Sequence, residues 1–342
     1  MIELQNLKNI VRNFHGKKIL VVGDLIADVY LDGRISRISR EAPVLILEEA
    51  GKKIVAGGAA NVIANAAALG GKVYAVGVIG ADDYGSRLKK ILTEHKVDVE
   101  GVVTDKSRPT ISKTRIIAGG RATVSQQIVR IDRESKEPLS KKIEAKLIGH
   151  LDKILPKVDG IILSDYGAGT ITDSLKKLVI RHAGKSKIPS MVDSRYNIGA
   201  FDGIGYAKQN DSELAAFVKT EINDMSSLID AGTKLLSTIN AWGVLITRGE
   251  LGMSLFERGG AVHHIPVTDK SEVFDVSGAG DTCVAAFILS LTAGAEPINA
   301  TRISNYAAGV AVRKLGTSTV NDKELLKALN NFAQEVGEKN VD

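Results

Sequence analysis

Residues 18–23 read KILVVG, a short and almost wholly apolar run that ends in glycine. A strand that is apolar on both sides is typical of a parallel sheet whose two faces are covered by helices. Similar runs recur along the chain at 72–79, 158–164, 190–193 and 244–247. Helical patterns separate them, at 59–69, 83–95, 143–155, 175–183 and 226–240, and only helical patterns follow residue 280. This alternation predicts an α/β fold with a mostly parallel central sheet and helices on both faces.

The composition is that of an ordinary globular protein, because 44% of the 342 residues are hydrophobic and 25% are charged. A single cysteine, Cys283, excludes an internal disulfide framework and indicates a reducing compartment. The most apolar stretch, 284–295, is too short to span a bilayer, and the first residues contain no apolar signal core. We therefore expect a cytoplasmic protein without a membrane partner. The net charge of +5 comes without a basic block interleaved with aromatic residues, so we expect no nucleic-acid partner.

Two segments, 29–55 and 110–131, interrupt the alternation of strands and helices. Each contains turn residues and alternates apolar with polar residues at a period of two, as antiparallel strands do. Long excursions from a compact domain are more often functional than idle. We expect a small β-lid over a substrate site; a solvated β-arm is the alternative. The rest of residues 1–335 is expected to form a single domain with these two lid segments, followed by a tail at 336–342.

The sequence DVSGAGD, residues 275–281, directly precedes an apolar helical stretch. Glycines at the start of a helix let backbone N–H groups approach an anion, and the helix dipole adds positive potential there. Asp281 at that place would serve as a base close to the anion. The alternative is an aspartate that only caps a packed helix, and the motif alone leaves both open.

A second glycine cluster, Gly57 and Gly58, opens the predicted helix that carries Asn61 one turn in. These residues either bind a ligand hydroxyl or phosphate, or allow tight contact between helix and sheet. Asp24 and Asp28 follow the first strand, at the sheet edge where ligands collect in parallel sheets. The alternative for both aspartates is a role in a turn.

Asn210 and Glu213 lie three residues apart, where a short strand passes into a helix. Their oxygens suit Mg²⁺, which prefers hard oxygen ligands and keeps several waters. The same spacing is that of a capping box, which needs no ligand. The two interpretations are compatible.

Together these motifs resemble those of the ribokinase-like (PfkB-type) carbohydrate kinases over nearly the whole length of the chain. The glycine pair with Asn61 resembles the family's N-terminal sugar-binding signature, and residues 275–281 resemble its C-terminal catalytic signature. Asn210 and Glu213 stand between the two, as in the family. The resemblance implies a ribokinase-like fold and the transfer of a phosphoryl group from ATP to a sugar hydroxyl.

Further stretches resemble bacterial heptose-7-phosphate kinases, namely residues 34–44, 126–132, 164–167 and 247–253. That group phosphorylates the C1 hydroxyl of D-glycero-β-D-manno-heptose 7-phosphate on the way to ADP-heptose for lipopolysaccharide. The sequence lacks the His-x-Gly-His motif of the nucleotidyltransferase that many members carry, so we expect the kinase alone. Departures from the family pattern at Ala168, Gln209 and Arg195 leave another sugar as the alternative, such as fructose 6-phosphate or ribose. A sugar- or nucleotide-binding module without catalysis is a minor alternative.

Phosphoryl transfer needs alignment and charge neutralisation more than covalent help. We expect Asp281 to take the proton from the sugar hydroxyl, and the backbone N–H groups of Gly278, Ala279 and Gly280 to hold charge on the transferred phosphoryl group. The resemblance implies the other sites: for ATP, Asn210, Thr247, Gly249, Gly252 and Asn305; for Mg²⁺, largely through water, Asn210 and Glu213; for the sugar, Asp28, Gly57, Gly58, Asn61 and Asp165; for the substrate phosphate, Lys113 and Arg115; for a monovalent cation such as K⁺, Asp275 and Ser277. Lids that cover each other's edges would make the protein a homodimer.

Overall fold

The central element of the fold is a mostly parallel sheet. The computed structural model describes residues 2–119, 126–135, 137–267 and 274–338. Within these residues the sheet has the strand order β13-β12-β11-β10-β9-β8-β1-β4-β5. Its strands are β1 (Lys18–Gly23), β4 (Lys72–Gly80), β5 (Asp98–Asp105), β8 (Gly160–Asp165), β9 (Ser190–Ser194), β10 (Tyr206–Asn210), β11 (Gly243–Thr247), β12 (Met253–Glu257) and β13 (Val262–Ile265). The pairings from β5 to β11 are parallel and those of β12 and β13 are antiparallel, which confirms the predicted fold class.

Strand β1 shows why the sheet is covered on both faces. Val21 belongs to one buried apolar cluster, and its neighbours Leu20 and Val22 belong to another. Because successive side chains of a strand point to opposite faces, an apolar run must bury two layers. One face packs against α1 (Ile2–Arg12), α2 (Ala59–Ala68), α3 (Asp83–Glu94), α8 (Ala279–Thr292), α9 (Pro297–Ala311) and α10 (Asp322–Glu338). The other face packs against α4 (Lys141–Ile154), α5 (Asp173–Ser186), α6 (Asp211–Val218) and α7 (Met225–Thr238).

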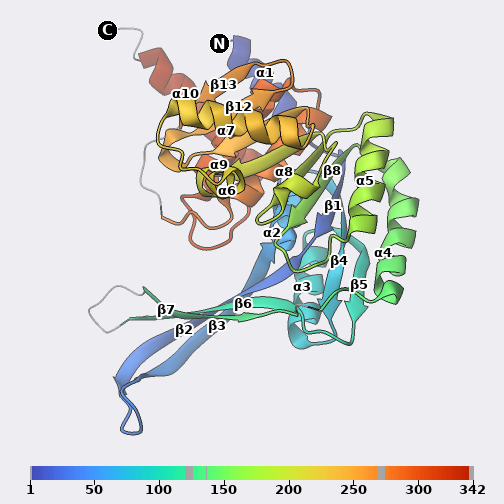
Figure 1. Cartoon of the computed structure of the whole chain (residues 1–342). Coiled ribbons are helices and arrows are strands. Elements are labelled where there is room, and N and C mark those ends of the chain that lie inside the picture. Colours follow the sequence, from blue (N-terminus) through green and yellow to red (C-terminus); the bar gives the residue numbers. More distant parts are fainter. Residues whose placement is uncertain (1, 120–125, 136, 268–273, 339–342) are drawn as a thin grey trace.

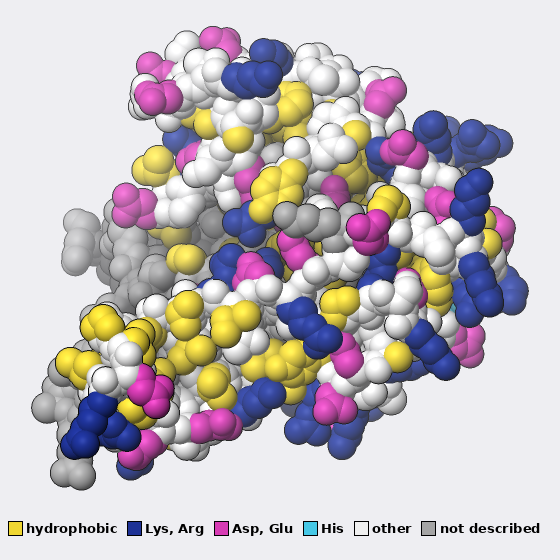
Figure 2. All heavy atoms as spheres, turned by 60° about the horizontal axis from the view of Figure 1, so that its bottom comes forward, with side chains coloured by type: hydrophobic (Ala, Val, Ile, Leu, Met, Phe, Trp, Pro, Cys, Tyr) yellow, Lys and Arg dark blue, Asp and Glu magenta, His cyan; other side chains and the backbone are white. Residues whose placement is uncertain are grey.

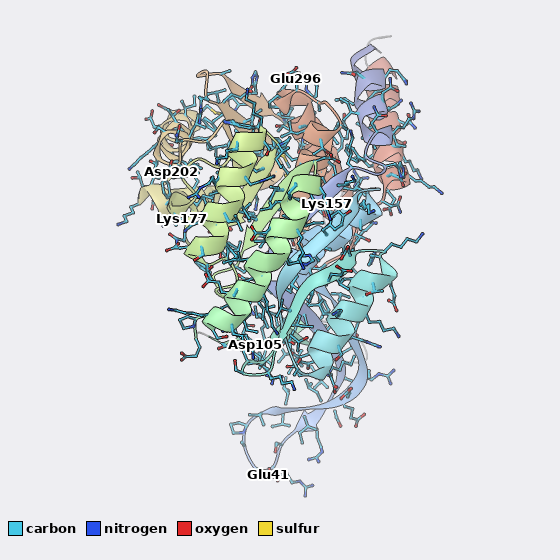
Figure 3. The ribbon with its side chains drawn as sticks, turned by 90° about the vertical axis from the view of Figure 1, so that its right-hand side faces the viewer. Glu41, Asp105, Lys157, Lys177, Asp202 and Glu296 are labelled. Atoms are coloured by element: carbon cyan, nitrogen blue, oxygen red, sulfur yellow. The ribbon has the colours of Figure 1, made fainter. Side chains whose placement is uncertain are left out.

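The helices α4 and α5 lie side by side over the sheet, as Figure 3 shows, where Lys177 marks α5 and Lys157 marks the turn that follows α4. As predicted, the described chain beyond residue 280 is helical, with α8, α9 and α10 as its regular elements. The termini come together, because α1 packs against α10 (Figure 1). Helix α10 runs to Glu338, so it includes the first residues of the tail predicted at 336–342; residues 339–342 lie outside the described chain, and the division into one domain and a tail stays a prediction. No helix of the described residues is long and apolar enough to cross a membrane.

A second sheet of four strands projects from the body of the molecule (Figure 1). Its order is β3-β2-β6-β7, formed by β2 (Leu25–Ile38), β3 (Leu45–Gly58), β6 (Ile111–Gly119) and β7 (Gln126–Arg133). We call this sheet the lid; Glu41 marks the tip of its first hairpin (Figure 3). Part of the second predicted segment, residues 120–125, lies outside the described residues.

The prediction of purely antiparallel excursions was wrong in one respect. Each segment forms an antiparallel pair, but β2 and β6 pair in parallel across the two segments. The parallel pairing of β2 with β6 follows from the direction of the strands that precede them in the sequence. Strand β2 continues from β1, and β6 follows β5; β1 and β5 run in the same direction in the central sheet, so β2 and β6 leave it in the same direction.

Candidate active site

A cavity of about 340 Å³ lies where strands of the central sheet end. Carboxyl ends of parallel strands meet at one edge, so residues far apart in sequence are brought together there. The cavity is lined by Asp165, Tyr166, Asp193, Arg195, Lys208, Asn210, Glu213, Val276, Ser277, Gly278, Gly280 and Asp281. The structure thus places the expected catalytic motif, the expected magnesium pair and Asp165 around one space.

Asp281 lies in the first turn of α8 and is 95% buried, with 5% of its surface exposed. Its carboxylate accepts hydrogen bonds from Asn61 Nδ2 at 2.7 Å and from Tyr166 Oη at 3.0 Å. The helix cap is Gly278, which has a φ of 80° and no side-chain capping bond. The capping alternative therefore does not describe Asp281, whose carboxylate is held from the side by two other elements.

The pKa of Asp281 is raised to about 7. Burial is the main cause, because it removes the water that would stabilise the charge; the hydrogen bond from Asn61 opposes it, and the nearby Asp193 adds to it. Burial and the neighbouring Asp281 raise the pKa of Tyr166. The phenol therefore keeps its proton and donates a hydrogen bond to the carboxylate of Asp281. A carboxyl group with a pKa near neutrality suits general-base catalysis at physiological pH.

Lys208 and Asp193 form a buried ion pair at 2.9 Å beside the first turn of α8. A Cβ atom on Gly280 would lie 2.9 Å from Lys208 Nζ, so the ammonium group lies against the backbone of this glycine. Burial disfavours the charge of Lys208, but Asp193 and Glu213 outweigh it and raise the pKa of the ammonium group. Lys208 is therefore a fixed cation at the place where the helix N-terminus would receive an anion.

The loop that carries Tyr166 is held by Asp24, which is fully buried. The carboxylate of Asp24 accepts three hydrogen bonds, from the backbone N–H groups of Tyr166 at 2.9 Å, Ala168 at 3.0 Å and Thr170 at 3.1 Å. From the sequence, Asp24 was predicted only to follow the first strand at the edge of the sheet. In the structure Asp24 fixes the loop whose tyrosine contacts Asp281.

Asn210 and Glu213 form the capping box of α6. Asn210 Oδ1 accepts from the Glu213 N–H at 2.8 Å, and Glu213 Oε2 accepts from the Asn210 N–H at 2.9 Å. Both residues also line the cavity, so the structural role leaves room for the second one. Among the described residues no group of three or more His, Cys, Asp or Glu could hold a metal ion. This donor set therefore fits Mg²⁺ only when water completes its coordination.

Three backbone N–H donors were expected from residues 278–280. The first of these positions, Gly278, requires glycine. A Cβ on Gly278 would lie 2.6 Å from Asn61 Nδ2, and its positive φ disfavours other residues. The N–H of Ala279 donates to the Val276 carbonyl at 3.3 Å, so this donor is already used within the turn. Gly280 is the second residue of α8, where N–H groups have no intrahelical partner.

Asp28 lies against the glycine pair on the lid side. It is buried, and a Cβ on Gly57 would overlap its carboxylate, so only glycine allows this approach. Gly58 has a φ of 54° and forms the cap of α2, the helix that carries Asn61. Arg115 on β6 donates to Asp28 Oδ1 at 2.6 Å, so the charge of Arg115 is compensated within the protein.

The residues expected to bind ATP form a neighbouring group. Thr247 pairs with Asn210 across β10 and β11, which connects this group to the cavity. A Cβ on Gly252 would overlap the Ile265 carbonyl, and Asn305 Nδ2 donates to the Pro266 carbonyl at 2.7 Å. Gly249 and Gly252 both have positive φ values, 55° and 84°. The binding of ATP by this group stays a prediction.

Asp275 joins two loops beside the cavity. Its carboxylate accepts from the N–H of Ser277 at 2.8 Å and from the N–H of Gly316 at 2.9 Å. Burial alone would raise its pKa, but these hydrogen bonds and the charge of Arg115 lower it, so Asp275 is ionised. An ionised oxygen cluster is compatible with a monovalent cation, which stays a prediction.

Sequence reasoning did not assign Tyr166, Asp193, Arg195 or Lys208 to the site, although all four line the cavity. Each lies at or near the end of a buried strand, β8, β9 or β10. Polar residues that directly follow or end an apolar run were the signal that could have found them.

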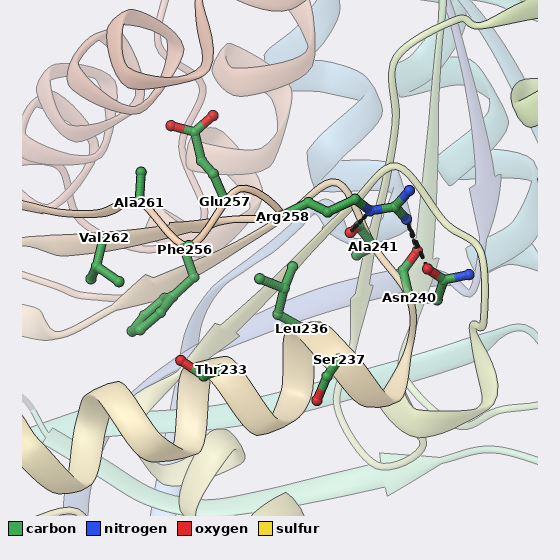
Figure 4. Close-up of a pocket in the computed structure, with 11 residues that line it drawn as sticks. Thr233, Leu236, Ser237, Asn240, Ala241, Phe256, Glu257, Arg258, Ala261 and Val262 are labelled. Carbon is green, nitrogen blue, oxygen red and sulfur yellow. Dashed lines mark hydrogen bonds between the residues drawn. The ribbon is translucent and has the colours of Figure 1, made fainter.

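A second cavity, also of about 340 Å³, lies between α7 and β12. Figure 4 shows its apolar side chains, Leu236, Phe256 and Val262, and the arginine at its edge. Arg258 donates to Asn240 Oδ1 at 3.0 Å and to the Ala241 carbonyl at 3.0 Å, so its guanidinium is bound to the protein itself. This cavity offers little polar chemistry to a ligand.

Known proteins resemble the chain over most of its length. It is 41% identical over 328 residues to the bifunctional protein HldE of Geobacter metallireducens, and 40% identical to that of Geobacter sulfurreducens. Each alignment covers 96% of this chain but 66% of the relative, so the chain spans about two thirds of the length of these relatives.

Solved structures share the fold. The Arabidopsis thaliana ribokinase complexed with ribose and ATP matches with a TM-score of 0.72 and 21% identity, over 92% of this chain and 99% of that one. The phosphofructokinase-2 of Escherichia coli in complex with substrates and products matches with a TM-score of 0.74 and 19% identity, over 93% and 99%. Residues 16–324 match the sequence pattern of the pfkB family carbohydrate kinases. The chain therefore belongs to the pfkB family of carbohydrate kinases.

Proposed function

We propose that this chain transfers the γ-phosphoryl group of ATP to the C1 hydroxyl of D-glycero-β-D-manno-heptose 7-phosphate, a step toward ADP-heptose. The observation that carries the kinase reaction is the buried Asp281, held by Asn61 and Tyr166 next to a helix N-terminus. The relatives named HldE support the heptose acceptor. So does the resemblance of residues 34–44 and 126–132 to heptose-7-phosphate kinases.

Asp281 is the base of the proposed reaction. Asn61 and Tyr166 fix the direction of its carboxylate, so a hydroxyl placed in the cavity meets an oxygen that is ready to accept its proton. The lid strands β2 and β6 would close over a bound acceptor and keep water from competing with it.

The first turn of α8 and Lys208 stabilise the negative charge of the phosphoryl group. Lys208 is held by Asp193, so its ammonium group needs no rearrangement when the phosphate arrives. Asn210 and Glu213 would hold Mg²⁺ through water, and the ion would neutralise phosphate charge there. Each of these parts acts by position and charge, as phosphoryl transfer requires.

The test is ADP release in the presence of Mg·ATP and a panel of sugars and sugar 1-, 6- and 7-phosphates. Selective turnover of D-glycero-β-D-manno-heptose 7-phosphate is the expected result. Turnover of fructose 6-phosphate or ribose instead would keep the base and change the acceptor. No turnover across the panel, with ATP still bound, would favour a binding module without catalysis.

We also infer that two chains pair through the lid. The described lid strands and the turn after β2 expose seven large apolar side chains: Ile35, Ile38, Val44, Leu45, Ile128, Val129 and Ile131. Figure 2 shows apolar side chains gathered on this projecting part of the molecule. Exposed apolar patches of this kind mark interaction surfaces, and the β3 and β7 edges of the lid offer unpaired strand edges. Light scattering on an Ile38→Lys, Ile131→Lys variant should show a monomer where the parent chain is a dimer; an unchanged mass would contradict this interface.

A further inference from the structure

Arg195 and Lys113 lie at or beside the active-site cavity, and neither makes an ion pair within the described residues. Arg195, after β9, lines the cavity together with Tyr166 and Asp281. Lys113, on the lid strand β6, has its Nζ atom 5.2 Å from the centroid of the Tyr166 ring. In the part of the chain that the structure describes, neither cation makes an ion pair; each lies over an aromatic ring.

The carboxylates near Lys113 are already used. Those that act on its charge are Asp28 and Asp132. Asp28 pairs with Arg115 at 2.6 Å, and Asp132 pairs with Arg130 at 2.8 Å. Neither of these two carboxylates is therefore left to neutralise Lys113.

The proximity of these two cations is unfavourable by itself. Lys113 is partly buried, and burial together with the nearby Arg195 lowers its pKa. The Arg195 guanidinium lies 5.7 Å from the centroid of the Tyr196 ring, and its backbone N–H donates to the Asp165 carbonyl at 3.0 Å, which fixes this loop. Like charges held near each other raise the free energy of the site, and an anion between them lowers it.

We propose that Lys113 and Arg195 bind the phosphate group of a phosphorylated acceptor sugar. The inference rests on the proposed kinase function and deepens it, because it makes a sugar phosphate, rather than a free sugar, the preferred acceptor. A phosphate monoester carries about −1.5 to −2 charges at neutral pH, which matches the two positive charges of Lys113 and Arg195. A guanidinium group can also bind two phosphate oxygens at once.

The position of the two cations assigns them to the acceptor rather than to ATP. Lys113 lies opposite Asp28 in the β2–β6 register, on the lid side of the cavity. The ammonium group of Lys113 lies over the ring of Tyr166, and the hydroxyl of Tyr166 donates a hydrogen bond to the base Asp281. The group expected to bind ATP lies on the other side, around Thr247 beyond β10. Lys208 is the cation of the transferred phosphoryl group and is neutralised by its own aspartate.

The test compares two acceptors that differ only in the phosphate, D-glycero-D-manno-heptose 7-phosphate and D-glycero-D-manno-heptose. Arg195→Gln and Lys113→Met are measured in the full chain with saturating Mg·ATP, and the KM of ATP is measured separately. The matched control is Lys52→Met, because Lys52 on the lid strand β3 also lies over a tyrosine ring, 5.0 Å from the centroid of Tyr84 in α3. Calorimetry without ATP gives the affinity for each acceptor independently of turnover.

We expect each cavity variant to raise the KM and the dissociation constant of the phosphorylated acceptor roughly 10- to 100-fold. The KM of ATP and kcat/KM for the unphosphorylated sugar should change less than about twofold, and the control should match the parent chain. Equal losses on both acceptors, an increase confined to the KM of ATP, or parental kinetics in both variants would each overturn the proposal. If the parent chain binds heptose 7-phosphate, with variant-sensitive affinity, but never turns it over, the phosphate subsite is supported and the proposed reaction is contradicted.

Discussion

The cavity at the strand ends and the cavity between α7 and β12 have the same volume, about 340 Å³, but very different linings. In the cavity between α7 and β12, Arg258 is bound to Asn240 and Ala241, and the walls are largely apolar (Figure 4). In the cavity at the strand ends, a buried carboxylate, a fixed ammonium group and the guanidinium-bearing Arg195 share one space, and Lys113 lies over the ring of Tyr166 beside it. The comparison shows that volume does not identify a site. A site is identified by buried polar groups that the fold holds in place around one space.

The largest expected effect comes from removing the base. Asp281→Asn keeps the shape of the side chain but cannot accept the proton, so kcat should fall about 10²- to 10⁴-fold. ATP affinity, measured by calorimetry, should stay within about twofold. The matched control is Glu257→Gln in the other cavity, for which parental kcat is expected. A similar loss in both variants would mean that the cavity at the strand ends is not special.

The next effect concerns the buried pair of Lys208 and Asp193. Lys208→Met leaves a buried carboxylate without its partner, so the free energy of unfolding should fall by roughly 3–5 kcal/mol and kcat roughly 10- to 100-fold. Urea unfolding and steady-state kinetics measure the two losses. Adding Asp193→Asn should recover stability but not activity. Recovery of both would show that Lys208 acts only through folding.

The pH dependence sharpens the comparison further. With a pKa of about 7, Asp281 is protonated in acid, so kcat/KM should fall about tenfold per unit below pH 7. Stability changes in the opposite sense. The folded pKa lies above the ordinary value of 3.8, so the contribution of Asp281 to stability is fully present below about pH 4 and is lost as pH rises through 7.

Thermal unfolding checks this sign. Asp281→Asn should be more stable than the parent chain at pH 8, and the difference should vanish near pH 4. A parent chain whose activity has no acid limb between pH 5 and 8 would contradict the assignment of the raised pKa to the base.

The smallest expected effect belongs to Tyr166. Tyr166→Phe removes one hydrogen bond to the Asp281 carboxylate, a bond that lowers the pKa of that carboxyl group. The acid limb of kcat/KM should therefore move to higher pH, and kcat at pH 8 should fall by roughly 3- to 10-fold. An unchanged acid limb would show that the phenol does not act on the base.

The fold could be predicted because its signals are local. Apolar runs such as 18–23 and the helical patterns between them determine which elements form and that the sheet is buried on both faces. The partners of the lid strands could not be predicted, since a period of two indicates a strand but not its neighbour. The parallel pairing of β2 with β6 follows from the direction of β1 and β5, which is a property of the whole sheet.

Part of the candidate site could also be predicted from the sequence, and part of it could not. Residues 275–281 and the glycine pair stand out in the sequence because their backbone needs are unusual. The contact of Asn61 with Asp281 spans 220 residues, and no local pattern predicts it. The same holds for the cations. The sequence favoured Lys113 and Arg115 for the substrate phosphate, but only the fold shows that Asp28 compensates Arg115 and that Arg195 lines the cavity, with no ion pair to any described residue.

The central claim is that Asp281 activates the C1 hydroxyl of a heptose 7-phosphate. The most direct measurement is a phosphorus NMR spectrum of the reaction with Mg·ATP, taken for the parent chain and for Asp281→Asn. The account predicts a new phosphate signal coupled to the anomeric proton with the parent chain, while the 7-phosphate signal remains, and no such signal with the variant. A new phosphate on another carbon, or an anomeric signal that persists with the variant at the parental rate, would contradict it.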